Sequence, residues 1–424
     1  MSSTFASLAI RNYRVRFIGF VIGNIGTWMQ RVAQDWYVLT VLTKDNGFAV
    51  GIVTALQFIP SLALAPVAGL VADRIDKRHI LLVTQVLQSL TAFLFGTLIL
   101  TGHAGMWQVF SIAFELGCVT AFDGPANQTF VGQLVPPRLI ANAVSLNSAS
   151  FNVARLVGPA VSGLLIGVVG CGWVFIINGC SFGFTIGALL MIRTSELHAE
   201  RLAPKAKGQI REGFKYVAKR SDIICILVTL GVVSCLGFNS QLTIGVMART
   251  IFNKQAGQYG ILTSMFAVGA LAGALMSARR QRPRVRLVLG AAFGFGAVSL
   301  LSGASPSYLV FGLTGILVGF FTLTLITTAN STVQLTTDPA YRGRVMSIYS
   351  IMSRGTTPIG SPTIGWVSQR FGPRWSIWVG ALAALVVSVV VALYARRRWH
   401  VHAHWAGWHR PFVEIVNPQS DDAD

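Results

Sequence analysis

The composition of this 424-residue chain excludes a water-soluble protein. Hydrophobic residues make up 53% of the chain and charged residues only 12%, whereas soluble proteins carry about a quarter charged residues. The 34 Lys and Arg against 15 Asp and Glu give a net charge of +19, which in a polar chain would suggest a nucleic-acid partner. All five cysteines lie in apolar stretches without a CxxC pair, so we expect buried side chains and neither disulfides nor a zinc site.

Twelve apolar runs are each long enough to cross a bilayer, for which a helix needs about 20 residues. They lie near residues 16–42, 48–72, 80–100, 106–122, 143–169, 173–192, 223–247, 258–278, 287–304, 308–333, 345–368 and 375–395. We therefore predict an all-α integral membrane protein with twelve transmembrane helices.

The basic residues predict the orientation of these spans, because Lys and Arg accumulate in cytoplasmic loops. With the N-terminus inside, 26 of the 34 basic residues fall on the cytoplasmic side and only 5 on the outer side. Most of the positive charge is thus an orientation signal and not evidence for nucleic-acid binding. We expect a multi-pass protein with both termini in the cytoplasm.

An internal repeat divides the chain into two halves of six spans. A shift of 202 residues pairs Pro137 with Pro339, Ser145 with Ser347, Ser148 with Ser350, Gly158 with Gly360, Gly163 with Gly365, Gly170 with Gly372 and Trp173 with Trp375. A second echo relates residues 51–54 (GIVT) to 260–263 (GILT). Because six is even, both halves enter from the same side, which predicts two pseudosymmetric six-helix bundles with a pathway between them. The expected domains are an N-terminal bundle (1–192), a cytoplasmic linker (193–222), a C-terminal bundle (223–395) and a cytoplasmic tail (396–424).

The loop between spans two and three reads GLVADRIDKR over residues 69–78. It resembles the GxxxDRxxRR motif of the major facilitator superfamily. The resemblance implies a gating loop formed by Gly69, Asp73, Arg74, Lys77 and Arg78. Physically, Gly69 permits close helix approach, Asp73 can sit at the N-terminal dipole of a neighbouring helix, and Arg74 can pair with acids across the gap. The second half carries only a degraded copy, which lacks the acidic residue.

Span five contains Gly158, Pro159 and Gly163, which resemble the GPxxGG signature of exporters in this superfamily. The match is partial, because Ser162 replaces the first paired glycine and Ala154 stands where the family often has Gly. With residues 26–36 and 342–345, these motifs make the chain similar to the bacterial drug and siderophore exporter branch, the transmembrane secretion effectors, which includes enterobactin-type exporters. The resemblance covers residues 5–394 and implies a secondary transporter of the bacterial cytoplasmic membrane.

Charged side chains inside spans cost about 2.5 to 3.5 kcal/mol each, so each is a candidate functional residue. Asn24, Trp28, Arg31 and Asp35 share one face of span one, which we expect to line an aqueous cavity. Pairing with Arg31 favours the charged form of Asp35, whereas burial favours its protonated form. When substrate or a conformational change withdraws Arg31, Asp35 is expected to take up a proton. The alternative is that Arg31 and Asp35 form a purely structural ion pair.

Three further charges lie inside spans. Glu115 of span four is a second candidate for proton coupling, and the alternative is a structural partner of Arg155 in span five. Arg155 and Arg354 of span eleven occupy near-equivalent positions in the repeat. Their functional interpretation is contact with anionic or carbonyl groups of a substrate or gate, and the alternative is an anchor on backbone carbonyls.

The resemblance implies that spans one, four, seven and ten line the central cavity, and polar residues in these spans agree with it. The substrate-cavity candidates are Asn24, Trp28, Asn239, Gln241, Thr324, Thr327, Thr328 and Ser331. For the threonines, the alternative is hydrogen bonding between helices.

The prediction for the whole chain is a monomeric exporter of amphipathic small molecules that works by alternating access in exchange for protons. We expect small-molecule substrate, protons and membrane lipids as partners, and neither an enzyme activity, a cofactor, a metal site nor a nucleic-acid partner. The alternatives are nutrient uptake, a dedicated siderophore exporter, a non-transporting membrane sensor and an intramembrane enzyme. The tail alternates His and Trp after three arginines, and we expect it to adsorb on anionic headgroups, with metal binding or pH sensing as the alternative.

Overall fold

The computed structural model describes residues 3–198, 209–278, 285–339, 341–399, 402–404 and 414–416. The first half of the chain forms α1 (Arg11–Tyr37), α2 (Gly47–Arg74), α3 (Lys77–Leu100), α4 (Met106–Leu134), α5 (Ile140–Val169) and α6 (Cys171–Leu190). The second half forms α8 (Ser221–Leu236), α9 (Ser240–Val246), α10 (Ala256–Ala278), α11 (Val285–Gly303), α12 (Tyr308–Thr336), α13 (Arg342–Arg354), α14 (Thr357–Phe371) and α15 (Pro373–Trp399), with α7 (Gln209–Ala218) between the halves. Short helical turns cover Ser3–Ala9, Val38–Leu42, Pro137–Leu139, Thr194–Glu196 and Met247–Ile251, and β1 (His402–His404) pairs antiparallel with β2 (Glu414–Val416). Most of the predicted lipid-binding tail and the end of the degraded loop copy lie outside the described residues.

Ten helical stretches of the described residues are long and apolar enough to cross a membrane. They coincide with ten of the twelve predicted spans. The other two are α1, which carries Arg31 and Asp35, and the pair α13–α14, which is interrupted after Arg354. Both still pack among the apolar helices, α1 against α5 and α6, and α14 against α2 and α8. The prediction of an all-α membrane fold with two pseudosymmetric six-helix bundles is confirmed.

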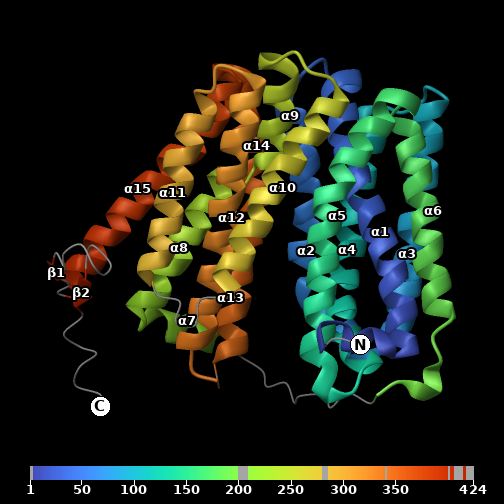
Figure 1. Ribbon diagram of the computed structural model, residues 1–424, viewed down its shortest axis with the longest axis horizontal. Coiled ribbons are helices and arrows are strands. Elements are labelled where there is room, and N and C mark those ends of the chain that lie inside the picture. Colours follow the sequence, from blue (N-terminus) through green and yellow to red (C-terminus); the bar gives the residue numbers. More distant parts are fainter. Residues whose placement is uncertain are drawn as a thin grey trace.

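Figure 1 shows the two bundles side by side, with α1–α6 in one and α8–α15 in the other. The N-terminus, α7 and the end of α15 lie at the same end of the molecule, at the bottom of the view. We call this end the N-terminal side and the opposite end the far side. The spans of odd number therefore run from the N-terminal side to the far side.

Repeat-equivalent glycines mark the same helix contact within each bundle. Gly158 of α5 corresponds to Gly360 of α14 under the 202-residue shift. A Cβ at Gly158 would lie 2.6 Å from the Cβ of Trp28 in α1, and a Cβ at Gly360 would clash with the carbonyl of Cys235 in α8. Helix α1 is the first span of the first half, and α8 is the first span of the second half. Span five therefore contacts span one in the same way as span eleven contacts span seven. Close backbone approach requires glycine here, because any side chain would separate the helices.

Another set of equivalent glycines joins the two bundles. A Cβ at Gly163 of α5 would lie 2.6 Å from the carbonyl oxygen of Ala256 in α10, and a Cβ at Gly365 of α14 would lie 2.6 Å from that of Gly47 in α2. The partner helices α10 and α2 contain the repeated GILT and GIVT sequences. The glycine of each sequence makes the contact, because Gly260 of α10 packs on α5 and residue 51 of α2 packs on α14. The two bundles therefore meet along α5–α10 and α2–α14, and both contacts lie toward the far side.

The distribution of the hydrophobic core agrees with closure on the far side. One continuous cluster there contains Trp36, Val50, Tyr259 and Leu262 and thus residues of both bundles. On the N-terminal side, the described residues form one cluster in each bundle, around Phe130 in the first and Leu230 in the second. The bundles share a core on the far side and have separate cores on the N-terminal side.

Candidate functional site

Trp28 of α1 lies at the centre of a cluster of arginine and aromatic side chains between the bundles. The guanidinium carbon of Arg31 is 5.3 Å from the centre of the Trp28 ring, and that of Arg155 in α5 is 5.7 Å from it. Phe151 of α5 packs edge-on against Trp28 at 5.7 Å. Arg155 also lies 5.5 Å from the ring of Phe266 in α10, so the cluster joins the two bundles. Cation–π contacts hold both arginines in place without neutralising their charge.

Arg354 completes this cationic cluster from the second bundle. It is the last residue of α13, directly before the break in span eleven, and its side chain is exposed. Arg31 interacts electrostatically with Arg354, with Arg155 and with Asp35. No hydrogen bond or ion pair joins any of the three arginines to another of the described residues, and none of their nitrogens is among the sealed, unpaired polar atoms. The alternative of an anchor on backbone carbonyls is therefore not seen for Arg155 or Arg354, and their nitrogens are not sealed from solvent.

Asp35 lies one helical turn farther toward the far side than Arg31. It lines a small cavity of about 10 Å³ between the bundles, with Val50 of α2, Gln241 and Val246 of α9, and Tyr259 of α10. This volume is near the minimum for one water molecule. Asp35 interacts electrostatically with Arg31 but forms no ion pair with it among the described contacts. The structural-pair alternative is thus not seen here, and Asp35 lies where the far side closes.

Glu115 of α4 lies apart from this cluster. Both of its carboxylate oxygens are sealed from solvent, and Thr91 of α3 is the side chain placed to hydrogen-bond them. Its polar neighbours are Thr91 of α3 and Cys118 of its own helix, and it forms no ion pair with Arg155. Its predicted role in proton coupling stays a hypothesis, and its position between α3 and α4 gives it no contact with Asp35.

The remaining cavity candidates differ in how their side chains are buried. Asn24, Thr324 and Thr328 each have a sealed side-chain atom without a partner, while Asn239 is buried and accepts a 2.6 Å hydrogen bond from Ser361 of α14. Thr327 is half-buried, Ser331 is exposed, and Gln241 shares the cavity of Asp35. Thr324 faces α10, because a Cβ at Gly273 would lie 2.9 Å from its hydroxyl. Trp28 and Gln241 therefore fit a cavity role best.

The predicted gating loop joins α2 to α3 on the N-terminal side. Helix α2 ends with Gly69, Asp73 and Arg74, and α3 begins with Lys77 and Arg78. The side chain of Asp73 lies outside the described residues, Arg74 is exposed, and no atom lies within 4 Å of a Cβ placed on Gly69. Arg78 donates from Nε to the Leu189 carbonyl at 2.8 Å, at the end of α6. This bond ties the loop to its own bundle, and a latch across the bundles stays a prediction.

The exporter-type motif lies at the contact of α5 with both α1 and α10. Gly158 packs on Trp28, whereas Pro159 and Gly163 pack on α10 of the other bundle. Ser162, which departs from the family pattern, donates a 2.8 Å hydrogen bond to the Met29 carbonyl of α1. The motif therefore links the cationic cluster to the contact that closes the far side.

A buried polar network in the first bundle was missed from the sequence. Arg16 of α1 is only 4% exposed and bonds to Asn127 of α4. Asp123 of α4 accepts hydrogen bonds from Asn127 at 2.9 Å, from Thr84 at 2.8 Å and from Gln85 at 2.9 Å. We placed the end of span four at residue 122, but α4 continues to Leu134 because these partners satisfy its polar groups inside the bundle. In the sequence, residues 123–128 (DGPANQ) are typical of a loop, because they combine Gly and Pro with polar side chains.

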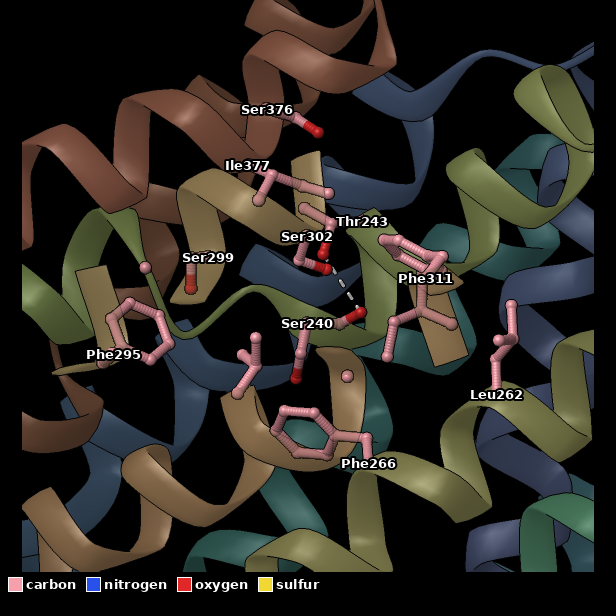
Figure 2. A pocket seen from close by; sticks show the side chains of 14 residues that line it. Ser240, Thr243, Leu262, Phe266, Phe295, Ser299, Ser302, Phe311, Ser376 and Ile377 are labelled. Atoms are coloured by element: carbon pink, nitrogen blue, oxygen red, sulfur yellow. Dashed lines mark hydrogen bonds between the residues drawn. The ribbon is translucent and has the colours of Figure 1, made fainter. Parts of the chain in front are cut away.

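A second cavity, of about 40 Å³, lies inside the C-terminal bundle at the break between α8 and α9. Figure 2 shows Ser240, Thr243 and Ser302 between the rings of Phe295 and Phe311. Phe266 closes one side and so separates this cavity from Arg155. The hydroxyl-lined space has room for about three water molecules, which would satisfy the interrupted helix.

Two six-helix bundles that enclose charged residues between them define a secondary transporter of the major facilitator type. Solved structures show the same fold. The POT family transporter PepTSo has a TM-score of 0.72 at 14% identity and covers 92% of this chain and 98% of its own. The nucleoside transporter NupG has a TM-score of 0.70 at 14% identity and covers 90% and 98%.

The chain belongs to the transmembrane secretion effector family, whose model matches residues 2–420. It is similar to the staphyloferrin A transporter of Staphylococcus aureus, with 24% identity over 88% of this chain and 94% of the relative. It is also similar to macrolide efflux protein A of Streptococcus pyogenes (20%; 89% and 96% covered) and to the multidrug efflux pump Tap of Mycolicibacterium fortuitum (24%; 88% and 93%). The protein is thus a multi-pass secretion or efflux transporter and not an enzyme.

Proposed function

We propose that this transporter exports amphipathic small molecules in exchange for protons by alternating access. In this proposal it acts as a monomer in the bacterial cytoplasmic membrane, surrounded by lipid, with both termini in the cytoplasm. The N-terminal side is then the cytoplasmic side. The predicted bundles (1–192 and 223–395) move relative to each other, joined by the linker (193–222), and the tail (396–424) follows. The efflux functions named for two of the relatives support export over nutrient uptake or a non-transporting sensor.

The observation that carries the proposal is the position of Arg31 between two sites. On one side it shares the Trp28 ring with Arg155, where donors reach open space. On the other side it acts on Asp35, in a cavity that exists only while the bundles meet on the far side. Arg31 can therefore serve as the counter-ion of a substrate or of Asp35, but not fully of both.

This shared counter-ion gives the coupling its sign. While the far side is closed, an ionised Asp35 in an almost dry cavity is tolerated because Arg31 balances it. A substrate that takes Arg31 leaves the carboxylate uncompensated, so substrate binding favours opening of the far side. A proton that neutralises Asp35 removes the same cost, so protonation favours closure. Substrate and proton thus drive opposite transitions, which is the requirement for exchange.

Transport in inverted membrane vesicles with an acidic interior tests this proposal. We expect amphipathic compounds of a substrate panel to accumulate inside and to dissipate the pH gradient as they enter. Vesicles with the empty vector provide the control. Lack of gradient-dependent movement of every compound, in vesicles that contain folded transporter, would contradict proton exchange.

Replacing Glu115 with Met is expected to stabilise the protein and to leave the pH dependence of export unchanged. A sealed carboxyl group with at most one hydroxyl partner costs about 1 to 3 kcal/mol, and an apolar side chain of similar size removes that cost. Thermal unfolding in detergent and vesicle transport measure the two effects. If Glu115→Met abolishes the pH dependence instead, Glu115 is a coupling residue after all.

The ion pair between Asp45 and Arg249 is expected to contribute weakly to closure of the far side. Asp45 precedes α2, Arg249 follows α9, and their side chains meet at 3.1 Å across the two bundles. Partly exposed pairs contribute about 0.2 to 1 kcal/mol, so Arg249→Gln should raise labelling of a far-side cysteine up to about fivefold. Combining Asp45→Arg with Arg249→Asp should restore wild-type labelling. Failure of the exchanged pair to restore it would show that the two side chains act independently.

A further inference from the structure

Two arginines from different spans share the Trp28 ring, and a third, Arg354, acts electrostatically on one of them. Arg31, Arg155 and Arg354 come from α1, α5 and α13, and Asp35 is the acidic group that acts electrostatically on Arg31. Arg31 and Arg155 are partly buried, each embedded cation costs about 2.5 to 3.5 kcal/mol, and repulsion between the arginines adds to that cost. Asp35 can balance only one of these positive charges, so the site is suited to bind a negatively charged group.

The guanidinium groups are also free to bind. The described side chains offer them no hydrogen bond, and their nitrogens are not sealed from solvent. A guanidinium carries five N–H donors in a planar fork that matches an oxyanion, and this pairing is stronger than one between neutral groups. Their hydrogen-bonding capacity therefore remains for a ligand.

The walls of the same site are aromatic. Trp28 and Phe151 pack against each other at 5.7 Å, and Phe266 faces Arg155 from the second bundle. Phe151 is 45% exposed although it contacts Trp28, so its ring also faces open space. An aromatic or other apolar body would bury its surface here while its charged end reached the arginines.

We infer that this exporter selects organic oxyanions, with the anionic group on Arg31 and Arg155 and the apolar body against Trp28, Phe151 and Phe266. The inference rests on the proposed function and narrows its substrate class from amphipathic molecules in general to anions. Arg354 lies exposed at the N-terminal side of the site and draws the anion inward. A cationic compound of the same shape is repelled by the same three charges.

Binding of three naphthalene derivatives to the purified full-length protein in lipid nanodiscs tests this inference. The probes are naphthalene-1-sulfonate, the neutral naphthalene-1-sulfonamide and the cation 1-naphthyltrimethylammonium, which share one apolar body. We expect the sulfonate to bind at least tenfold more tightly than either of the others. Equal or weaker binding of the sulfonate overturns the inference.

Variants of the arginines provide the second measurement. Arg155→Gln is expected to weaken sulfonate binding by about tenfold to a hundredfold, the loss of a charge-assisted hydrogen bond, and Arg155→Lys should restore part of it. Arg286→Gln removes one positive charge from an exposed position of α11 and is the matched control. If both variants are folded, equal sulfonate affinity of Arg155→Gln and Arg286→Gln overturns the inference.

The transport assay separates this inference from the proposed function. If the sulfonate binds in an arginine-dependent manner but no pH gradient moves it into inverted vesicles, proton exchange fails and anion selection stands. If the gradient moves the sulfonamide or the cation in preference to the sulfonate, exchange stands and anion selection fails.

Discussion

Replacing Asp35 with Asn is expected to reduce proton-driven export to background while substrate binding from the N-terminal side is retained. A permanently neutral side chain removes the cost of closing the far side, so the protein should remain closed there. Asn also leaves Arg31 free, and an oxyanion should then bind about tenfold more tightly, the size of a charge-assisted hydrogen bond of about 1.5 kcal/mol. Tighter binding together with lost export distinguishes this result from misfolding.

The pH dependence of binding provides the matching control. In the wild type, acid neutralises Asp35 and frees Arg31, so oxyanion affinity should rise as the pH falls. Asp35→Asn should show high affinity that does not change with pH. Glu196→Gln removes an exposed acid that pairs with Arg193 on the surface and should behave as wild type. Wild-type pH dependence of binding in Asp35→Asn would remove Asp35 from the coupling mechanism.

The sequence predicts the fold almost completely, because membrane helices are recognised by their apolar composition. A lipid environment demands about 20 apolar residues per span, and positive loops orient them. The exceptions are α1, which carries Arg31 and Asp35 together with Asn and Gln residues, and span eleven, which is split into helices of 13 and 15 residues. Likewise, α4 extends to Leu134 through polar residues that hydrogen-bond inside the bundle. Hydropathy does not identify a membrane helix whose polar side chains are hydrogen-bonded by other helices.

The candidate site is predicted in part. One helical face brings Trp28, Arg31 and Asp35 together by spacing alone, and the structure keeps them on that face. Arg155 lies beside this face and Glu115 does not. This difference depends on how α4 and α5 are rotated about their axes. Rotation is set by close glycine contacts such as that of Gly158 with Trp28, which no spacing reveals in advance. The cationic cluster is therefore a product of helix packing.

Closure of the far side should be sensitive to a single methyl group at Gly260. Its Cβ would meet the carbonyl of Pro159, a backbone atom that cannot rotate away. Overpacking of this kind costs about 1 to 3 kcal/mol, and the strain is relieved when the bundles separate. Gly260→Ala should therefore shift the equilibrium about fivefold to a hundredfold toward the far-side-open state.

A cysteine placed at Val246 reports this shift, since Val246 is 2% exposed and lines the cavity beside Asp35. In a background without the five native cysteines, a membrane-impermeant maleimide added from the far side should label it faster in Gly260→Ala than in the parent. Gly167→Ala is the matched control, because nothing lies within 4 Å of its Cβ. Lowering the pH should slow the labelling of Gly260→Ala again, since protonation of Asp35 favours closure. Equal labelling of the two alanine variants would mean that the α5–α10 contact does not hold the far side shut.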